Sequence, residues 1–465
     1  MSSLPTELIQ SLQNVKGFNE EAFKAVHQSG GQLTSIRLNP DKFNIQNLTF
    51  KIDGTVPWNT KGYYLTERPS FTSDPLFHAG AYYVQEASSM FLEEAIKQTV
   101  DLSKPLKILD LCAAPGGKST LIQSIISKDS LLVSNEVIKT RVNILCENVT
   151  KWGAANVIVT NNDPKDFQRL QSYFDVVVVD APCSGSGLFR KDPSAIEEWS
   201  ENNVQLCAHR QQRILADIMP SLKGGGILIY STCSYSQQED EDIADWLVKE
   251  FKGESLKLKV EENWKIVEAI GEKEKTHGYR FYPDKVKGEG FFISAFRKIK
   301  KEEQYNEIKS HPANGRAKAK KDTAAVSMKE VEILKSYLVN AHDLFFIKQN
   351  DEAIALPKSL ENELGLIQSS LYIKKAGVKL GTLIRNELIP AHELAVSNII
   401  DASAPRHEVD LETALQYLRK EEIKINTDAR GWILLAHQQL PMGWVKIMPN
   451  RINNYYPAAW RILNK

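Results

Sequence analysis

Short apolar runs alternate with longer amphipathic stretches between residues 105 and 235. Each run has the aliphatic or β-branched side chains of a buried strand, and the stretch after it repeats its apolar positions at helical spacing. The runs predicted as strands are 106–111, 131–136, 156–160, 176–179 and 227–230. Repeated strand–helix units of this length predict an α/β fold with a parallel, doubly wound sheet and right-handed crossovers.

Two cysteines follow predicted strands directly, where the apolar run gives way to polar, turn-forming residues. Cys183 lies in an Asp-Ala-Pro-Cys segment after 176–179, and Cys233 lies in a Ser-Thr-Cys-Ser segment after 227–230. A cysteine that only packs as a small hydrophobe belongs inside the apolar run. The carboxyl ends of parallel strands form the edge where ligands bind. Because thiolates are strong nucleophiles, two thiols at this edge predict covalent chemistry on a weakly electrophilic ring carbon.

A glycine-rich turn, 112–118, connects the first predicted strand to a helix. Its Gly-Gly-Lys-Ser end is similar to a phosphate-binding loop, but that motif requires a glycine where Cys112 stands. The spacing of a dinucleotide-binding loop is also missing. The turn is therefore a tight backbone bend without a phosphate cradle.

Acidic residues end three further predicted strands, at Glu136, Asp163 and Asp180. Glu136 can accept hydrogen bonds from both hydroxyls of a ribose, and Asp163 can accept one from an exocyclic adenine amine. Asp180 would favour a nearby positive charge such as a sulfonium. An adenosine without a phosphate chain fits these groups, so we predict S-adenosylmethionine as the cofactor, and no metal site.

Composition limits the remaining possibilities. A chain of 465 residues is too long for one core, and its 58 basic and 58 acidic residues balance, so any nucleic-acid surface must be local. Five cysteines without disulfide-like spacing suit a reducing compartment. No apolar stretch reaches the length of a membrane span. We expect a soluble, cytoplasmic monomer with no membrane partner.

These segments resemble the Sun-type RNA cytosine-5 methyltransferases, and the chain's length and C-terminal appendage are most similar to the bacterial RsmF-like branch. The resemblance implies a Rossmann-like methyltransferase sheet, a small α+β N-terminal domain and a C-terminal, β-rich PUA-like module that binds RNA. The segments 277–283 and 288–292 resemble the last catalytic motif of the family. One departure is Asp284, where histidine would be expected.

The resemblance also implies a role for each candidate site residue. One segment is implied to wrap around S-adenosylmethionine, and it consists of Cys112, Ala113, Ala114, Pro115, Gly116, Gly117 and Lys118. Glu136 is implied to hold the ribose, Asp163 to contact the adenine, and Asp180 to lie near the methionine moiety and the target base. Cys233 corresponds to the nucleophile, and Cys183 to the cysteine that assists product release.

The expected organisation has five segments. They are an N-terminal RNA-binding or substrate domain (1–75), the catalytic domain (76–299), a basic linker (300–327), a first C-terminal domain (328–400) and the PUA-like domain (401–465). The linker is rich in lysine without apolar periodicity, as in a solvated tether or a segment that contacts phosphates. Arg37, in the N-terminal domain, is expected at the surface or in an ion pair.

Aromatic and basic residues interleave in the last segment, at Trp444, Lys446, Arg451 and Tyr455. Such a pattern is typical of a β core with a basic rim, and its place after a methyltransferase favours RNA binding. We expect the C-terminal modules to bring RNA to the catalytic domain without taking part in the chemistry.

The chemistry of cytosine dictates the expected mechanism. Carbon 5 accepts a methyl group only after a thiolate has added to carbon 6 and made the ring an enamine. Asp180 could protonate or hydrogen-bond ring N3, and the target base must first be flipped out of its stack. Ribosomal RNA of the small subunit is the expected substrate.

Other functions remain open at this point. The catalytic residues are equally compatible with a methyltransferase of transfer RNA. A non-catalytic RNA-binding factor of ribosome assembly would not need both Cys183 and Cys233, and a DNA cytosine methyltransferase would use the Pro-Cys thiol as nucleophile and lack Thr-Cys-Ser.

Overall fold

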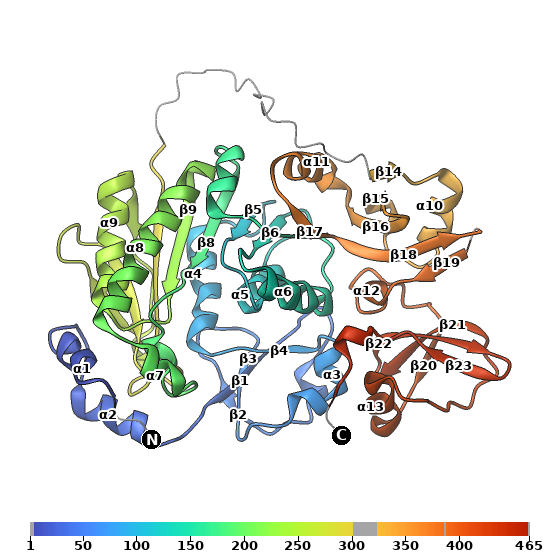
Figure 1. Cartoon of the computed structure of the whole chain (residues 1–465), viewed down its shortest axis with the longest axis horizontal. Helices are drawn as coiled ribbons and strands as arrows, with labels where there is room; N and C mark the ends of the chain where they lie inside the picture. The colour runs from blue at the N-terminus through green and yellow to red at the C-terminus, as the bar shows by residue number, and fades with distance from the viewer. Residues whose placement is uncertain (1–3, 301–322, 386, 464–465) are drawn as a thin grey trace.

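A ten-stranded sheet forms the centre of the computed structural model, which describes residues 4–300, 323–385 and 387–463 (Figure 1). Its parallel part has the order β7-β6-β5-β8-β9. These strands are β5 (Lys107–Asp110), β6 (Leu131–Asn135), β7 (Val157–Thr160), β8 (Phe174–Asp180) and β9 (Leu222–Thr232). The strand order changes direction at β5, with β6 and β7 on one side of it and β8 and β9 on the other. Because these strands are parallel, their carboxyl ends share one edge of the sheet, and α/β sheets bind ligands where the strand order changes direction.

Antiparallel strands complete the sheet beyond β9. They are β13 (Phe291–Arg297), β12 (His277–Phe281) and β11 (Val267–Ile270), with β10 (Glu254–Leu256) paired to β13. The predicted α/β, Rossmann-like fold is thereby confirmed, as a mixed sheet with a parallel centre.

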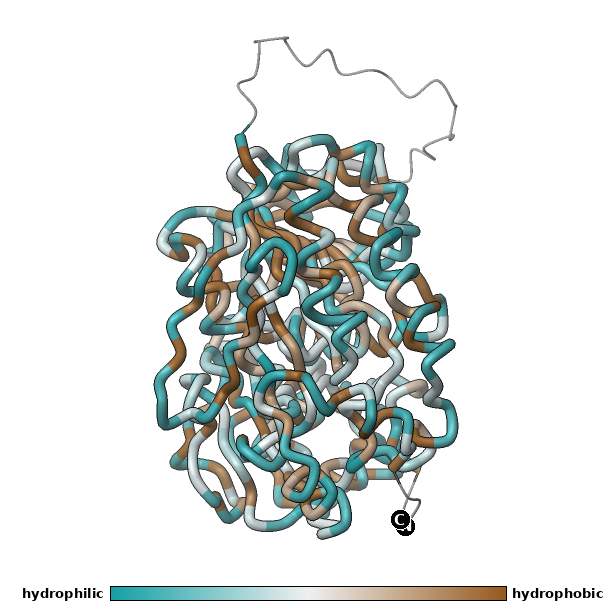
Figure 2. The backbone as a smooth tube through the Cα atoms, turned by 90° about the vertical axis from the view of Figure 1, so that its left-hand side faces the viewer, coloured by the Kyte–Doolittle hydropathy of each residue, from teal (hydrophilic) through white to brown (hydrophobic). Residues whose placement is uncertain are grey.

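Helices cover both faces of the sheet because its central strands are apolar on both faces. Val177 and Val179 pack toward α8 (Glu201–Ile218) and α9 (Glu241–Phe251), and the alternate valines of β8 pack on the other face. That second face is covered by α4 (Leu92–Thr99), α5 (Gly117–Ile125) and α6 (Lys139–Trp152). Apolar stretches run through the interior and hydrophilic turns lie outside (Figure 2). Each fully buried valine, leucine or isoleucine contributes about 1.5–3 kcal/mol.

The N-terminal part is a small α+β unit. Its helices are α1 (Thr6–Leu12), α2 (Glu20–Gln28) and α3 (Pro75–His78), and its sheet has the order β2-β3-β1-β4 with β1 (Thr34–Leu38), β2 (Ile52–Thr55), β3 (Gly62–Leu65) and β4 (Tyr82–Val84).

Arg37 lies on β1 and is buried, so the expectation of a surface position is wrong. Its guanidinium donates to Gln85 and Thr120, which ties β1 to the segment after β4 and to α5. Burial lowers the pKa of Arg37 to about 9.

The first C-terminal module contains a five-stranded sheet of order β14-β15-β16-β18-β19. Its elements are β14 (Thr323–Ala325), α10 (Met328–Lys335), β15 (Leu344–Gln349), β16 (Glu352–Pro357), α11 (Glu361–Ser370), β18 (Val378–Ile384), β19 (Glu387–Pro390) and α12 (His392–Ala395). Between α11 and β18, strand β17 (Ile373–Ala376) leaves this module and pairs antiparallel with β7. The module thus adds the outermost strand to the catalytic sheet.

The last module has a four-stranded sheet, β20 (Arg406–Glu408), β21 (Gly431–His437), β22 (Leu440–Met448) and β23 (Arg451–Asn454), with α13 (Leu411–Arg419) against it. Trp444 is only 1% exposed and donates its indole N–H to the carbonyl of Ala391, so it cannot stack on a base. Tyr455 is 41% exposed and packs on Trp432, over which the ammonium of Lys446 lies.

The expected domain boundaries stay predictions, and most of the expected linker, 300–327, lies outside the described residues. None of the helices described within 4–300, 323–385 and 387–463 is long and apolar enough to cross a membrane.

Candidate active site

Cys183 and Cys233 lie close together at the carboxyl edge of the sheet. They follow the neighbouring parallel strands β8 and β9, in which Asp180 is paired with Ser231. The two sulfur atoms are 2.8 Å apart, and both cysteines are free and half-buried. Adjacent strands that run in the same direction bring their ends to one place, which is why residues fifty positions apart meet here.

The environment of the Cys183 thiol disfavours its ionisation. The hydrogen bond to Cys233 and burial together raise the pKa of the Cys183 thiol well above its usual range. Cys183 therefore keeps its proton and can donate it toward the sulfur of Cys233.

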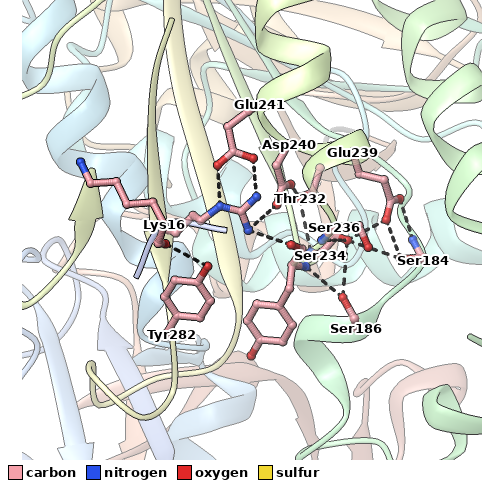
Figure 3. Close-up of polar contacts among 12 residues, drawn as sticks. Lys16, Ser184, Ser186, Thr232, Ser234, Ser236, Glu239, Asp240, Glu241 and Tyr282 are labelled. Carbon is pink, nitrogen blue, oxygen red and sulfur yellow. Dashed lines mark hydrogen bonds and ion pairs between the residues drawn. The ribbon is translucent and has the colours of Figure 1, made fainter. Parts of the chain in front are cut away.

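A single buried carboxylate holds both cysteine loops in place. Glu239, in the short 3-10 helix Gln237–Glu239, accepts hydrogen bonds from the hydroxyls of Ser184 and Ser234 (Figure 3). It also accepts the backbone N–H of Ser184 at 2.9 Å and the amide of Gln211 at 3.1 Å. Each serine directly follows one of the cysteines, so Glu239 fixes the separation of the two sulfurs. Burial raises the pKa of Glu239, although these hydrogen bonds oppose the rise.

Arg280 anchors the same segment from the other side. Its guanidinium forms a two-point contact with Glu241, lies 3.1 Å from Asp240, and donates to the backbone carbonyl of Tyr235 at 2.8 Å. All of these groups are buried (Figure 3 shows the two carboxylates). The carboxylate of Asp240 accepts a hydrogen bond from the hydroxyl of Thr232, the residue before Cys233. The loop that contains Cys233 is thus held by buried polar contacts on both sides.

Asp180 lies beside the cysteine pair and carries an ion pair. One of its carboxylate oxygens accepts the hydroxyl of Ser231 at 2.8 Å, and the other lies 2.7 Å from the ammonium of Lys118. Burial acts against charge on Lys118, but Asp180 outweighs it and raises the pKa of the ammonium, with smaller contributions from Asp110 and Cys233. Lys118, predicted only as part of the cofactor turn, is thereby paired with Asp180 beside the two cysteines.

The glycine-rich turn leads from β5 into α5 and is held by side chains that donate to its backbone carbonyls. Gly116 has φ of 118°, a left-handed conformation that favours glycine, and it forms the N-cap of α5. The carbonyl of Ala114 accepts from Arg141 at 2.6 Å, and that of Pro115 accepts from Asn148 at 2.9 Å. Burial raises the pKa of the Cys112 thiol beyond the range in which it would ionise. Cys112 thus suits packing and not nucleophilic attack.

Glu136 and Asp163 follow the neighbouring parallel strands β6 and β7. Glu136 is buried, accepts the backbone N–H of Ile138 at 2.9 Å, and lies 3.5 Å from the guanidinium of Arg141. Asp163 is exposed and caps the 3-10 helix Pro164–Arg169 through the backbone N–H of Lys165. Their placement is compatible with one ligand that spans both strand ends.

A buried carboxylate beneath the turn provides a test of the expected cofactor. Asp110 ends β5 and accepts the hydroxyl of Ser119 with one oxygen, while its other oxygen has no hydrogen-bond partner among the described residues. Burial raises the pKa of Asp110 to about 7. An unpartnered carboxylate oxygen suits a cation, and S-adenosylmethionine carries an ammonium and a sulfonium. The residues present therefore fit this cofactor.

Sequence reasoning did not single out Asp110 or Glu239. Asp110 lies inside a predicted strand, and only its position before the glycine-rich turn could have indicated a role. Glu239 begins the acidic run Glu239–Asp242, and such a run is typical of a solvated surface segment. Nothing in the local sequence indicates that Glu239, Asp240 and Glu241 of this run are buried.

Comparisons with known proteins found family models that match three successive parts of the chain. The family model described as 16S rRNA methyltransferase RsmB/F matches residues 98–297. The model of the N-terminal domain of 16S rRNA methyltransferase RsmF matches 4–87, and that of the methyltransferase RsmF PUA domain matches 404–462.

Two similar curated proteins are both named ribosomal RNA small subunit methyltransferase F. The one from Aliivibrio salmonicida is 29% identical over 442 residues, which cover 91% of this chain and 90% of the relative. The one from Pectobacterium atrosepticum is 27% identical over 478 residues, with 98% and 95% covered.

Solved structures share the fold. A methyltransferase homologue from Pyrococcus horikoshii is 28% identical, with a TM-score of 0.52 over 64% of this chain and 100% of that chain. NSun6 from the same organism, solved with SFG, an analogue of S-adenosylmethionine, has a TM-score of 0.54 at 20% identity, over 64% of this chain and 99% of that chain. The three matched segments, in the order N-terminal, catalytic and PUA domain, show that this chain belongs to the RsmB/F family of methyltransferases.

Proposed function

We propose that this protein transfers a methyl group from S-adenosylmethionine to carbon 5 of a cytosine in the RNA of the small ribosomal subunit. The observation that carries the proposal is the cysteine pair, with Cys183 and Cys233 2.8 Å apart at the carboxyl edge of a methyltransferase sheet. The names of the similar proteins support ribosomal RNA of the small subunit as the substrate.

Cys233 is the nucleophile in this proposal. Its thiolate adds to carbon 6 of the flipped cytosine, which makes carbon 5 an electron-rich enamine carbon. The Lys118 ammonium lies 2.7 Å from Asp180 and would attract the negative charge of a thiolate at Cys233. Asp180 and Lys118 together can hydrogen-bond or protonate ring N3 as charge develops there.

Cys183 acts in product release. After a base removes the proton from carbon 5, the double bond between carbons 5 and 6 re-forms and the sulfur of Cys233 leaves as a thiolate. The Cys183 thiol, which retains its proton, can donate it to the departing sulfur. S-adenosylmethionine, held by 112–118, Glu136, Asp163 and Asp180, supplies the electrophilic methyl group when bound.

The last module supplies a surface suited to RNA. Tyr455 packs on Trp432 with ring centroids 4.4 Å apart, and Lys446 lies 5.2 Å from the Trp432 ring. Arg451, at the start of β23, is exposed nearby, opposite Met448 in the β22–β23 pair. Exposed aromatic faces next to cations suit stacking and phosphate contact.

Transfer of labelled methyl groups tests the proposed activity. The purified chain is incubated with methyl-labelled S-adenosylmethionine and with small-subunit ribosomal RNA, assembled small subunits or transfer RNA, and the product nucleosides are separated. Label in 5-methylcytidine from ribosomal RNA or the subunit is the expected result. Label in transfer RNA alone would assign the other substrate, and no label in any RNA would contradict the proposed activity.

Replacing Glu136 with alanine is expected to weaken cofactor binding by about 1–3 kcal/mol, since a hydrogen bond to a charged group is lost. Isothermal calorimetry with S-adenosylmethionine measures this effect. Glu147→Ala, on the same helix as Arg141 but at its far end, is the matched control and should leave the dissociation constant unchanged. Equal affinities for wild-type and Glu136→Ala proteins would remove Glu136 from the site.

Replacing Glu239 with alanine is expected to lower kcat by roughly a hundredfold, because the two cysteine loops lose their common acceptor and the sulfurs lose their alignment. The dissociation constant of the cofactor should stay the same, since Glu239 contacts neither the turn 112–118 nor Glu136. Glu250→Ala, at an exposed position of α9, is the control. An unchanged kcat in Glu239→Ala would show that Glu239 does not position the cysteines.

A further inference from the structure

Strand β17 brings the first C-terminal module to the edge where the cofactor is proposed to bind. It runs antiparallel to β7, with Ile373 opposite Thr160, so its first residue lies at the carboxyl end of β7. Tyr372, just before β17, is therefore next to the loop that contains Asn161, Asn162 and Asp163. This loop belongs to the proposed adenine site.

Hydrogen bonds fix Tyr372 to that loop. The carbonyl of Tyr372 accepts the backbone N–H of Asn161 at 3.2 Å and the side-chain amide of Asn162 at 3.0 Å. The N–H of Tyr372 donates to the side-chain oxygen of Asn162 at 2.9 Å. The side-chain amide of Asn162 therefore pairs with the backbone of Tyr372 as a neighbouring strand would. This pairing holds the C-terminal module next to Asn162, the residue before Asp163.

The same loop reaches the proposed ribose site. The side chain of Asn161 donates to the carbonyl of Glu136 at 2.6 Å and to that of Val137 at 3.1 Å. Asn135 donates to the carbonyl of Asn162 at 3.0 Å and to that of Leu111, next to the glycine-rich turn, at 3.2 Å. A chain of amide hydrogen bonds therefore joins Tyr372 to the strand ends proposed to hold the cofactor.

Three large apolar side chains are exposed around this loop. Tyr372 is 61% exposed, Val137 is 52% and Ile138 is 46%. The neighbours of Tyr372, Leu371 and Ile373, pack into the core on the side of the sheet that α8 and α9 cover. Side chains alternate along extended segments, so the exposed ring of Tyr372 is expected on the opposite side, which α6 covers and where Ile138 is the N-cap of α6.

We infer that Tyr372 of the first C-terminal module is part of the S-adenosylmethionine site, where its ring forms one wall for the adenine and Val137 and Ile138 lie on the other side. The inference rests on the proposed function, and specifically on the cofactor site around Glu136 and Asp163. Adenine is a flat, apolar ring with polar groups along its edge. The exposed ring of Tyr372 can stack on such a base, and the carboxylate of Asp163 can accept a hydrogen bond from its amine. The C-terminal module thus takes part in cofactor binding besides its proposed role toward RNA.

Calorimetry with S-adenosylmethionine on full-length variants tests this inference. Tyr372→Ala should raise the dissociation constant by about 5- to 100-fold, the range of a base–aromatic stack, whereas Tyr372→Phe should stay within about twofold of wild type. Ile384→Ala, which changes an exposed apolar residue at the end of β18 in the same module, is the control and should have no effect. Because Tyr372 is exposed, Tyr372→Ala should keep the wild-type melting temperature without cofactor, and its loss of affinity should appear in KM for the cofactor and not in kcat.

The possible outcomes separate the inference from the proposed function. If Glu136→Ala loses affinity and Tyr372→Ala does not, the cofactor site stands and the role of Tyr372 is overturned. If neither variant loses affinity, the proposed cofactor site itself is overturned. A loss in Tyr372→Phe as large as in Tyr372→Ala would also overturn the inference, because the phenyl ring retains the stacking face.

Discussion

Replacing Cys233 with alanine is expected to abolish both methyl transfer and the covalent protein–RNA complex. Without the Cys233 thiolate no bond to carbon 6 can form, carbon 5 stays unreactive, and the loss should be on the order of a thousandfold or more. Methyl transfer is measured with labelled cofactor, and the covalent complex is measured as a band that survives denaturing electrophoresis. Cofactor affinity should be retained, because Cys233 lies outside the turn 112–118.

Cys183→Ala provides the matched comparison, since it removes the other thiol of the same pair. The adduct should form and accumulate in this variant, because the group that assists departure of Cys233 has been removed while the nucleophile remains. The opposite pattern, with an adduct in Cys233→Ala and none in Cys183→Ala, would contradict the proposed roles and assign the nucleophile to Cys183.

Arg280→Met is expected to lower the free energy of unfolding by about 3–5 kcal/mol. The variant would leave Asp240 and Glu241 buried without their cation, and removing one partner from a buried charge cluster has a cost of this size. It would also leave the carbonyl of Tyr235 without its donor. Denaturant unfolding, followed by circular dichroism, measures the change.

The control for this variant is Arg297→Met. Arg297 is also an arginine on a strand of the same sheet, but it is partly exposed and lies 3.6 Å from the exposed Glu254. A pair of this kind contributes about 0–1 kcal/mol. Equal effects of the two substitutions would show that the buried cluster around Arg280 does not hold the loop that contains Cys233.

The sequence is sufficient to predict the parallel centre of the sheet and the meeting of Cys183 with Cys233. Apolar runs bounded by turn residues mark the strands, and parallel strands necessarily bring their ends to one edge. The proximity of Glu136 and Asp163 follows from the same geometry. These features depend on local pattern and on topology, which a single sequence contains.

Features that depend on contacts between modules could not be predicted. Strand β17 has the sequence Ile-Lys-Lys-Ala, without the alternation of a buried strand, and it forms because β7 offers a free edge. Trp444 is buried because the first C-terminal module covers it through Ala391, which the pattern around it does not indicate. Arg37 is buried by partners 48 and 83 residues away, Gln85 and Thr120.

Sequencing of bisulfite-treated small-subunit ribosomal RNA tests the central claim most directly, because 5-methylcytosine resists the deamination that converts cytosine to uracil. RNA from cells that lack the gene is compared with RNA from the same cells supplied with wild-type protein or with Cys233→Ala. The proposed function predicts at least one cytosine that is protected with the wild-type protein and converted with the other two. Identical conversion of every cytosine in all three samples would contradict it.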